Sequence, residues 1–195
     1  KKYKKVAILQ GGISDEYKIS KLSASAVYKV LKYKYNCKLI NVGKNCISLI
    51  KKLESFRPDI VFNCLHGYFG EDGQIQSILN FLGFPYTHSG VLASSMAMDK
   101  KKSKVFFKGL KISVPDEIDP LCKKLNTFPI IAKPINGGSS NGIKILKNKD
   151  ELNKFIKRVG VNLHRFIFEK FIEGREITVG IINNKVCGIM EIKFK

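Results

Sequence analysis

The chain has 195 residues, 44% hydrophobic and 26% charged, which are proportions typical of a globular protein. Its net charge of +19 favours anionic ligands such as nucleotides and keeps nucleic acid open as a partner. The lysines are spread along the whole chain, however, so a generally basic surface without specific nucleic-acid binding is the favoured interpretation. No long apolar run and no signal-peptide pattern occurs, so we expect a cytoplasmic protein without a membrane partner.

The first ninety residues alternate between predicted strands and predicted helices. Short apolar runs predict strands at residues 3–9, 38–42, 59–65 and 84–87. Apolar residues at helical spacing predict helices over residues 19–30, 47–53 and 74–82, the first from Ile19, Leu22, Ala26 and Val30. This alternation predicts an α/β fold with an open parallel sheet, whose ligands lie beyond the carboxyl ends of the strands.

After residue 91 the pattern changes, which places a domain boundary near Ala93. Residues 91–109 predict two abutting helices, and residues 128–146 predict a strand, a glycine loop and a second strand. A helix at residues 150–159 and strands at 166–171, 176–182 and 186–192 follow. Asn183 and Asn184 predict a hairpin turn between the last two strands.

The loop "NGGSSNG", residues 136–142, lies between two predicted strands. Taken alone, it fits a flexible hairpin turn better than a binding site. It matches neither a Walker A loop nor a dinucleotide fingerprint. Its glycines would nevertheless let backbone amides crowd an anion, Ser139 and Ser140 add hydroxyl donors, and Lys133 adds a positive charge. These are the parts of a loop that covers phosphate.

Two further segments carry polar groups at predicted strand ends. In "NCLHGYFGEDG", residues 63–73, His66 stands near Glu71 and Asp72 among glycines. This loop could hold a substrate, or His66 could be structural and the two acids could begin the next helix. Glu16 opens the first predicted helix, where it either complements the helix dipole or faces a ligand ammonium.

Five blocks of the sequence stand in the order and spacing of one known family. They are "GGISDEYKIS", "LHGYFGEDG", "HSGVLASSMAMDKKKSK", "AKPINGGSSNG" and "EKFIEGREITVG". In these blocks the chain resembles the D-alanine–D-alanine ligases of the ATP-grasp superfamily. The chain departs from the usual family pattern at Tyr17, Lys18 and Asn141.

The resemblance implies a nucleotide site between two α/β subdomains, with the glycine-serine loop closing over the phosphates. The residues implied in contacting phosphates are Lys100, Lys133, Ser140 and the amides near Gly142. Those implied at the adenine and ribose are Glu169, Lys170, Ile172 and Glu176. Glu16 is implied to pair with the ammonium of the first D-alanine, with Ser139 and His66 near the same substrate.

The resemblance also implies the reaction and its cofactors. ATP, with Mg²⁺ or Mn²⁺, would activate one D-alanine as an acyl phosphate for attack by a second, giving a peptidoglycan precursor. A homodimer is implied as well. The family's metal ligands and closing loop would lie beyond Lys195, so we expect these residues alone neither to fold fully nor to catalyse.

The resemblance divides the chain into three parts. Residues 1–93 would form an N-terminal Rossmann-like domain, residues 94–164 the central ATP-grasp subdomain, and residues 165–195 the start of an incomplete C-terminal subdomain. The alternatives are a related carboxylate–amine ligase that uses D-lactate or D-serine, a noncatalytic nucleotide-binding remnant, and a basic nucleic-acid-binding protein.

Overall fold

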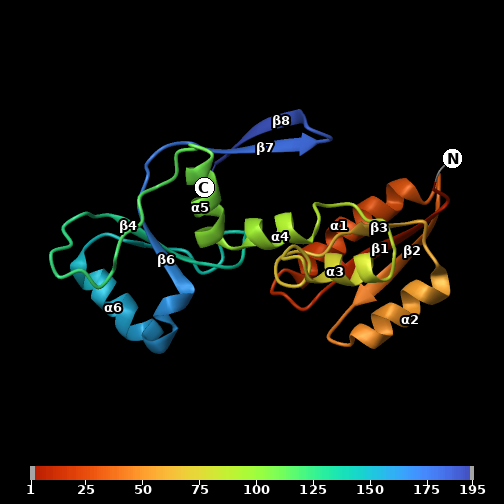
Figure 1. Cartoon of the computed structure of the whole chain (residues 1–195), viewed down its shortest axis with the longest axis horizontal. Helices are drawn as coiled ribbons and strands as arrows, with labels where there is room; N and C mark the ends of the chain where they lie inside the picture. The colour runs from red at the N-terminus through yellow and green to blue at the C-terminus, as the bar shows by residue number, and fades with distance from the viewer. Residues whose placement is uncertain (1–2, 194–195) are drawn as a thin grey trace. The chain divides into compact units, whose positions relative to one another are not determined.

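The structure is a computed structural model that describes residues 3–193, and its chain forms two compact units (Figure 1). The first unit comprises the residues up to 114, together with residues 133–143 and 164–167. The second comprises residues 115–132, 144–163 and those from 168 onward. Each unit is described by itself below.

The first unit is built on a parallel sheet with strand order β2-β1-β3. Its strands are β1 (Lys5–Gly11), β2 (Asn36–Val42) and β3 (Ile60–Asn63), and the connecting helices are α1 (Tyr17–Leu31) and α2 (Cys46–Phe56). The predicted parallel α/β sheet is therefore confirmed. The strand predicted at residues 84–87 is reduced to a single parallel bridge between Val61 and Tyr86.

Side chains on the two faces of β1 enter two separate hydrophobic clusters. Ala7 and Leu9 join a core with Leu49 and Leu53 of α2 and with residues of α3 (Gln74–Phe81). Val6 and Ile8 face the other way, toward Ala24 of α1. Because both faces are covered, the strand reads as a continuous apolar run.

Helix α1 buries a different face from the one that its largest apolar residues suggest. Ser20 and Ala24 are fully buried, and Ser20 Oγ accepts a hydrogen bond of 2.9 Å from the Gly11 amide. Ile19, Leu22 and Val30 are 51%, 68% and 70% exposed. The small side chains of Ser20 and Ala24 let the helix approach β1 closely. The helix was therefore predicted correctly, but the apolar residues that predicted it face outward.

The first unit continues through α4 (Val91–Met98) and α5 (Lys100–Gly109), as predicted for two abutting helices. Asp99 separates them and accepts a hydrogen bond of 3.0 Å from the Lys102 amide, which caps α5. The glycine-serine loop contacts this junction. Its Gly137 amide lies 3.3 Å from Met98 Sδ, and the Lys100 amide donates to the Ile135 carbonyl at 3.0 Å.

A sheet of strand order β5-β4-β6 lies mainly in the second unit, which also contains the helix α6 (Lys149–Val159). Its strands are β4 (Ile130–Pro134), β5 (Lys144–Leu146) and β6 (Phe166–Lys170), and a 3-10 helix, η1 (Gly160–Arg165), precedes β6. β4 and β5 pair in antiparallel register, with Ile130 opposite Leu146. The helix packs through Leu152 and Phe155, whose ring meets Phe168 edge to face at 5.9 Å.

A two-stranded hairpin ends the described chain. It is formed by β7 (Glu176–Ile182) and β8 (Lys185–Ile192), and Asn183 and Asn184 make its turn with φ of 49° and 61°, as predicted. Apolar side chains of both strands are exposed, among them Ile182 at 66% and Ile189 at 67%. Among the helices of residues 3–193, none is long and apolar enough to cross a membrane.

Candidate active site

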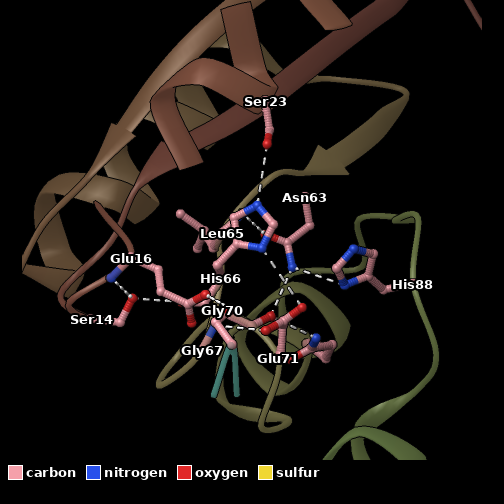
Figure 2. Close-up of polar contacts among 12 residues, drawn as sticks. Ser14, Glu16, Ser23, Asn63, Leu65, His66, Gly67, Gly70, Glu71 and His88 are labelled. Carbon is pink, nitrogen blue, oxygen red and sulfur yellow. Dashed lines mark hydrogen bonds and ion pairs between the residues drawn. The ribbon is translucent and has the colours of Figure 1, made fainter. Parts of the chain in front are cut away.

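Three loops of the first unit meet at the carboxylate of Glu16 (Figure 2). Glu16 is the N-cap residue of α1, but its side chain makes no capping hydrogen bond. Ser139 Oγ, from the glycine-serine loop, donates a hydrogen bond to Glu16 Oε1. Gly67 lies so near that a Cβ added there would be 2.8 Å from Glu16 Oε2. The structure therefore brings Glu16 and Ser139 into contact.

His66 lies beside this carboxylate, between α1 and its own loop (Figure 2). Its Nε2 is 3.3 Å from Ser23 Oγ, and its Nδ1 is 3.9 Å from Glu71 Oε1. Its carbonyl accepts a hydrogen bond of 2.7 Å from Ser14 Oγ, which ties the loop after β1 to the loop after β3. Neither serine was predicted from the sequence, although Ser14 lies two residues before Glu16.

The two acids of this loop have different structural roles. Asp72 accepts from the Gln74 amide at 3.2 Å and from the Phe69 amide at 2.9 Å, so it begins α3 as one interpretation predicted. Glu71 instead accepts a hydrogen bond of 2.7 Å from the Gly67 amide. Its carboxylate thus faces the site rather than the helix, because the loop turns back over itself at Gly67.

Asn63, at the end of β3, fixes the start of the loop and was not singled out from the sequence. It is 3% exposed, its Nδ2 donates to the Gly70 carbonyl at 2.8 Å, and its Oδ1 accepts from the Leu65 amide at 3.1 Å. Gly70 packs against Leu65 with no room for a side chain. Cys64, next in the chain, is 5% exposed, and burial raises the pKa of its thiol to about 11.

The residues implied in phosphate contact lie around the glycine-serine loop. Lys100 Nζ donates a hydrogen bond of 2.8 Å to the Gly137 carbonyl at the start of this loop. Ser139 and Ser140 adopt left-handed backbone conformations, with φ of 51° and 57°. Lys133 lies on β4, three residues before the loop begins. These two residues form a tight turn, in which the Asn141 amide donates to the Gly138 carbonyl at 3.1 Å.

The remaining implied residues belong to the second unit. Glu169, on β6, is 4% exposed, and the following Lys170 amide donates to the Asp116 carbonyl at 3.0 Å. Ile172 is 61% exposed in the loop after β6, and Glu176 is the first residue of β7. A buried carboxylate and an apolar side chain close to it in sequence are groups that could bind a nucleoside.

Comparison with solved structures identifies the fold. A D-alanine–D-alanine ligase from Bacillus anthracis superposes with a TM-score of 0.83 at 34% identity, over 97% of this chain and 64% of that one. A second structure of a ligase from the same organism, complexed with ATP, gives 0.82 at 31% identity, over 98% and 67%. The chain is thus an α/β protein of the ATP-grasp class.

Comparison with protein-family models identifies the family within the ATP-grasp class. Residues 92–195 match the model described as D-ala D-ala ligase C-terminus, and residues 47–89 match the D-ala D-ala ligase N-terminus. D-alanine–D-alanine ligases from Pelagibacter ubique and Rhodospirillum rubrum are 44% and 39% identical, each over 97% of this chain. The chain belongs to the D-alanine–D-alanine ligase family, and it spans 65% of the length of these two relatives.

Proposed function

We propose that the complete protein joins two D-alanines at the expense of ATP. The observation that carries this proposal is the convergence of Glu16, Ser139 and His66 from three segments of one unit. Family membership supports it, since both relatives named above are D-alanine–D-alanine ligases. Because the Glu16 carboxylate at the start of α1 does not cap the helix, it is suited to pair with the ammonium group of an amino acid.

The chemistry requires an activated carboxylate, because amide formation would otherwise expel an oxide ion. The γ-phosphoryl group of ATP is transferred to the carboxylate of the first D-alanine, giving an acyl phosphate and ADP. The amine of the second D-alanine then attacks the carbonyl carbon, and the tetrahedral intermediate expels phosphate. In this scheme Glu16 would hold the ammonium of the first substrate, and Ser139 would orient Glu16 through their hydrogen bond.

The basic residues near the glycine-serine loop would hold the nucleotide. Lys100 and Lys133 would neutralise phosphate charge, while Ser140 and the amides near Gly142 would cover the phosphates and exclude water. The ATP complex of the Bacillus anthracis ligase supports ATP as the nucleotide. Glu169, Lys170, Ile172 and Glu176 would then line the adenine and ribose pocket.

Magnesium or manganese is expected with ATP in this family. Among residues 3–193, no group of three or more His, Cys, Asp or Glu side chains is placed to hold a metal ion.

The wider role follows from the product. A D-alanyl-D-alanine synthetase would supply peptidoglycan precursors in the cytoplasm and would thereby influence cell-wall growth and cell shape. We also propose a homodimer, which the outward apolar face of α1 supports. The family model that begins at residue 92 supports the proposed domain boundary after residue 93, and the further boundary after residue 164 is proposed with it.

The test is phosphate release from ATP by the complete gene product, with D-alanine compared with L-alanine. D-alanine-dependent release should fall at least about tenfold in Glu16→Gln, because truncating one partner of a charge pair costs a few kcal/mol. Lys133→Ala should raise KM for ATP, whereas Lys124→Ala, an exposed lysine outside the candidate site, should match the parent protein. ATP turnover that ignores D-alanine would contradict the proposal.

A further inference from the structure

His88 contacts Asn63 at the candidate site, and its backbone has an unusual conformation. Its φ is 111°, in a region that glycine adopts freely and that residues with a Cβ rarely adopt. The residue is exposed as a whole, yet its Nδ1 edge faces Asn63, with 3.3 Å between Nδ1 and Asn63 Nδ2 (Figure 2). Such a conformation persists only where surrounding contacts hold it, and it often marks a functional site.

The neighbours of Asn63 determine which of its atoms faces His88. The Leu65 amide can only donate, and it lies 3.1 Å from Asn63 Oδ1. The Gly70 carbonyl can only accept, and it lies 2.8 Å from Asn63 Nδ2. A flipped side-chain amide would lose both hydrogen bonds, so the group that faces His88 is N–H. His88 Nδ1 must then be the acceptor, which requires a neutral imidazole with its proton on Nε2.

This contact supports the loop that carries the first-substrate residues. Asn63 joins the end of β3 to Gly70, and within that span lie His66 and Gly67, whose amide donates to Glu71 at 2.7 Å. Protonation of His88 would place a donor against the donor of Asn63. The hydrogen bond between His88 and Asn63 would then be lost, at the residue that connects the end of β3 to the loop.

The ionisable groups that act on His88 are those of this same loop. Partial desolvation lowers the pKa of His88 below its usual value; Glu71 acts to raise it and His66 to lower it. The neutral form that the hydrogen bond requires is therefore the form present at neutral pH. It is lost as the pH falls through the pKa of His88.

We propose that His88 is a positioning residue: its neutral imidazole, accepting a hydrogen bond from Asn63, keeps the loop after β3 in the geometry that places His66 at the first D-alanine. Protonation of His88 releases this hold and weakens binding of the first substrate. The inference about the substrate rests on the proposed function. The inference about the protonated nitrogen does not.

The first experiment reads the tautomer directly in the complete gene product. Long-range ¹H–¹⁵N spectra of the imidazoles at pH 7.5 should show His88 with Nε2 protonated and Nδ1 bare. The signal is assigned by its loss in His88→Asn. A proton on Nδ1 of His88 at this pH would overturn the proposal, whatever reaction the protein catalyses.

The second experiment measures KM for the first D-alanine between pH 5.5 and 8.5. Losing one hydrogen bond of this kind should raise KM about two- to tenfold as His88 protonates, with a smaller change in kcat. His88→Asn keeps an acceptor oxygen, tolerates positive φ and does not titrate, so this acidic rise should disappear. His88→Gly relieves the backbone but removes the acceptor, so its KM should be raised at every pH.

Either of two results would refute the positioning role. One is an acidic rise in KM that survives unchanged in His88→Asn, and the other is a parental KM in His88→Gly at pH 8. A protein with the expected tautomer but no D-alanine-dependent phosphate release would instead refute the proposed function and the substrate part of the inference. The tautomer spectrum thus separates the two failures.

Discussion

Replacing Gly70 with alanine should destabilise the first unit, because the loop after β3 leaves no space for a Cβ. The added carbon would lie 2.5 Å from Leu65 Cβ, 2.8 Å from the Leu65 carbonyl carbon and 3.0 Å from the His66 amide nitrogen. Carbon atoms in contact prefer about 3.5–4.0 Å, so the two backbone segments must separate by about 1 Å. That movement also strains the 2.8 Å hydrogen bond from Asn63 to the Gly70 carbonyl.

The expected cost of Gly70→Ala is about 3 kcal/mol, at the upper end of the overpacking range because the obstacle is backbone. With a urea m-value of about 2 kcal/mol/M, the unfolding midpoint should fall by about 1.5 M. The assay is urea-dependent alkylation of Cys64, which is buried beside the loop, followed by peptide mass spectrometry. Gly43→Ala is the matched control, since a Cβ at Gly43 meets nothing within 4 Å. Equal midpoints for the two variants would refute the packing argument.

Three further predictions follow from the same unit. At pH 8 and without denaturant, Cys64 should be alkylated about a hundredfold more slowly than a thiol with a pKa near 9, because the pKa of Cys64 is about 11 and less of it is thiolate. Equal alkylation rates would contradict the burial of Cys64. Backbone amides at the start of β1 lower the pKa of Asp59. The ionised carboxylate therefore stabilises the fold at pH values above the pKa of Asp59 in the unfolded chain, and this stabilisation is lost as the pH falls through its pKa in the folded protein. Asp59→Asn should lower Tm at pH 7 and make Tm fall less steeply as the solution is acidified. Ser139→Ala removes the hydrogen bond to Glu16, so limited proteolysis should cut the glycine-serine loop several times faster than in Ser140→Ala.

Periodicity in the sequence predicted most elements of this fold, because strand and helix patterns are local. The alternation of apolar runs and helical spacings gave the order β1 to α3 of the parallel sheet. Turn chemistry located the hairpin at Asn183 and Asn184, where two residues of positive φ are needed. Pro85, by contrast, lies in a predicted strand that became one bridge, since proline has no amide for a sheet ladder.

Which side of a helix is buried could not be taken from hydrophobicity alone. In α1 the buried positions Ser20 and Ala24 are small, because the helix approaches β1 closely enough for Ser20 Oγ to meet the Gly11 amide. The large residues Ile19 and Leu22 are left outside. Side-chain size at a close contact is set by the distance between elements, and that distance is not encoded in the residues of one element.

Part of the candidate site could be predicted from the sequence and part could not, because distances between elements are again not encoded locally. Glu16 and His66 follow β1 and β3, which are neighbouring parallel strands, so a parallel sheet alone brings their loops to one edge. Ser139 is 123 residues from Glu16 and reaches it through a loop that Lys100 holds at Gly137. No local pattern specifies such a contact. Because Glu16 and His66 are placed by neighbouring strands and Ser139 by a glycine-rich loop, the order of the strands predicts that the first two lie near each other but says nothing about the third.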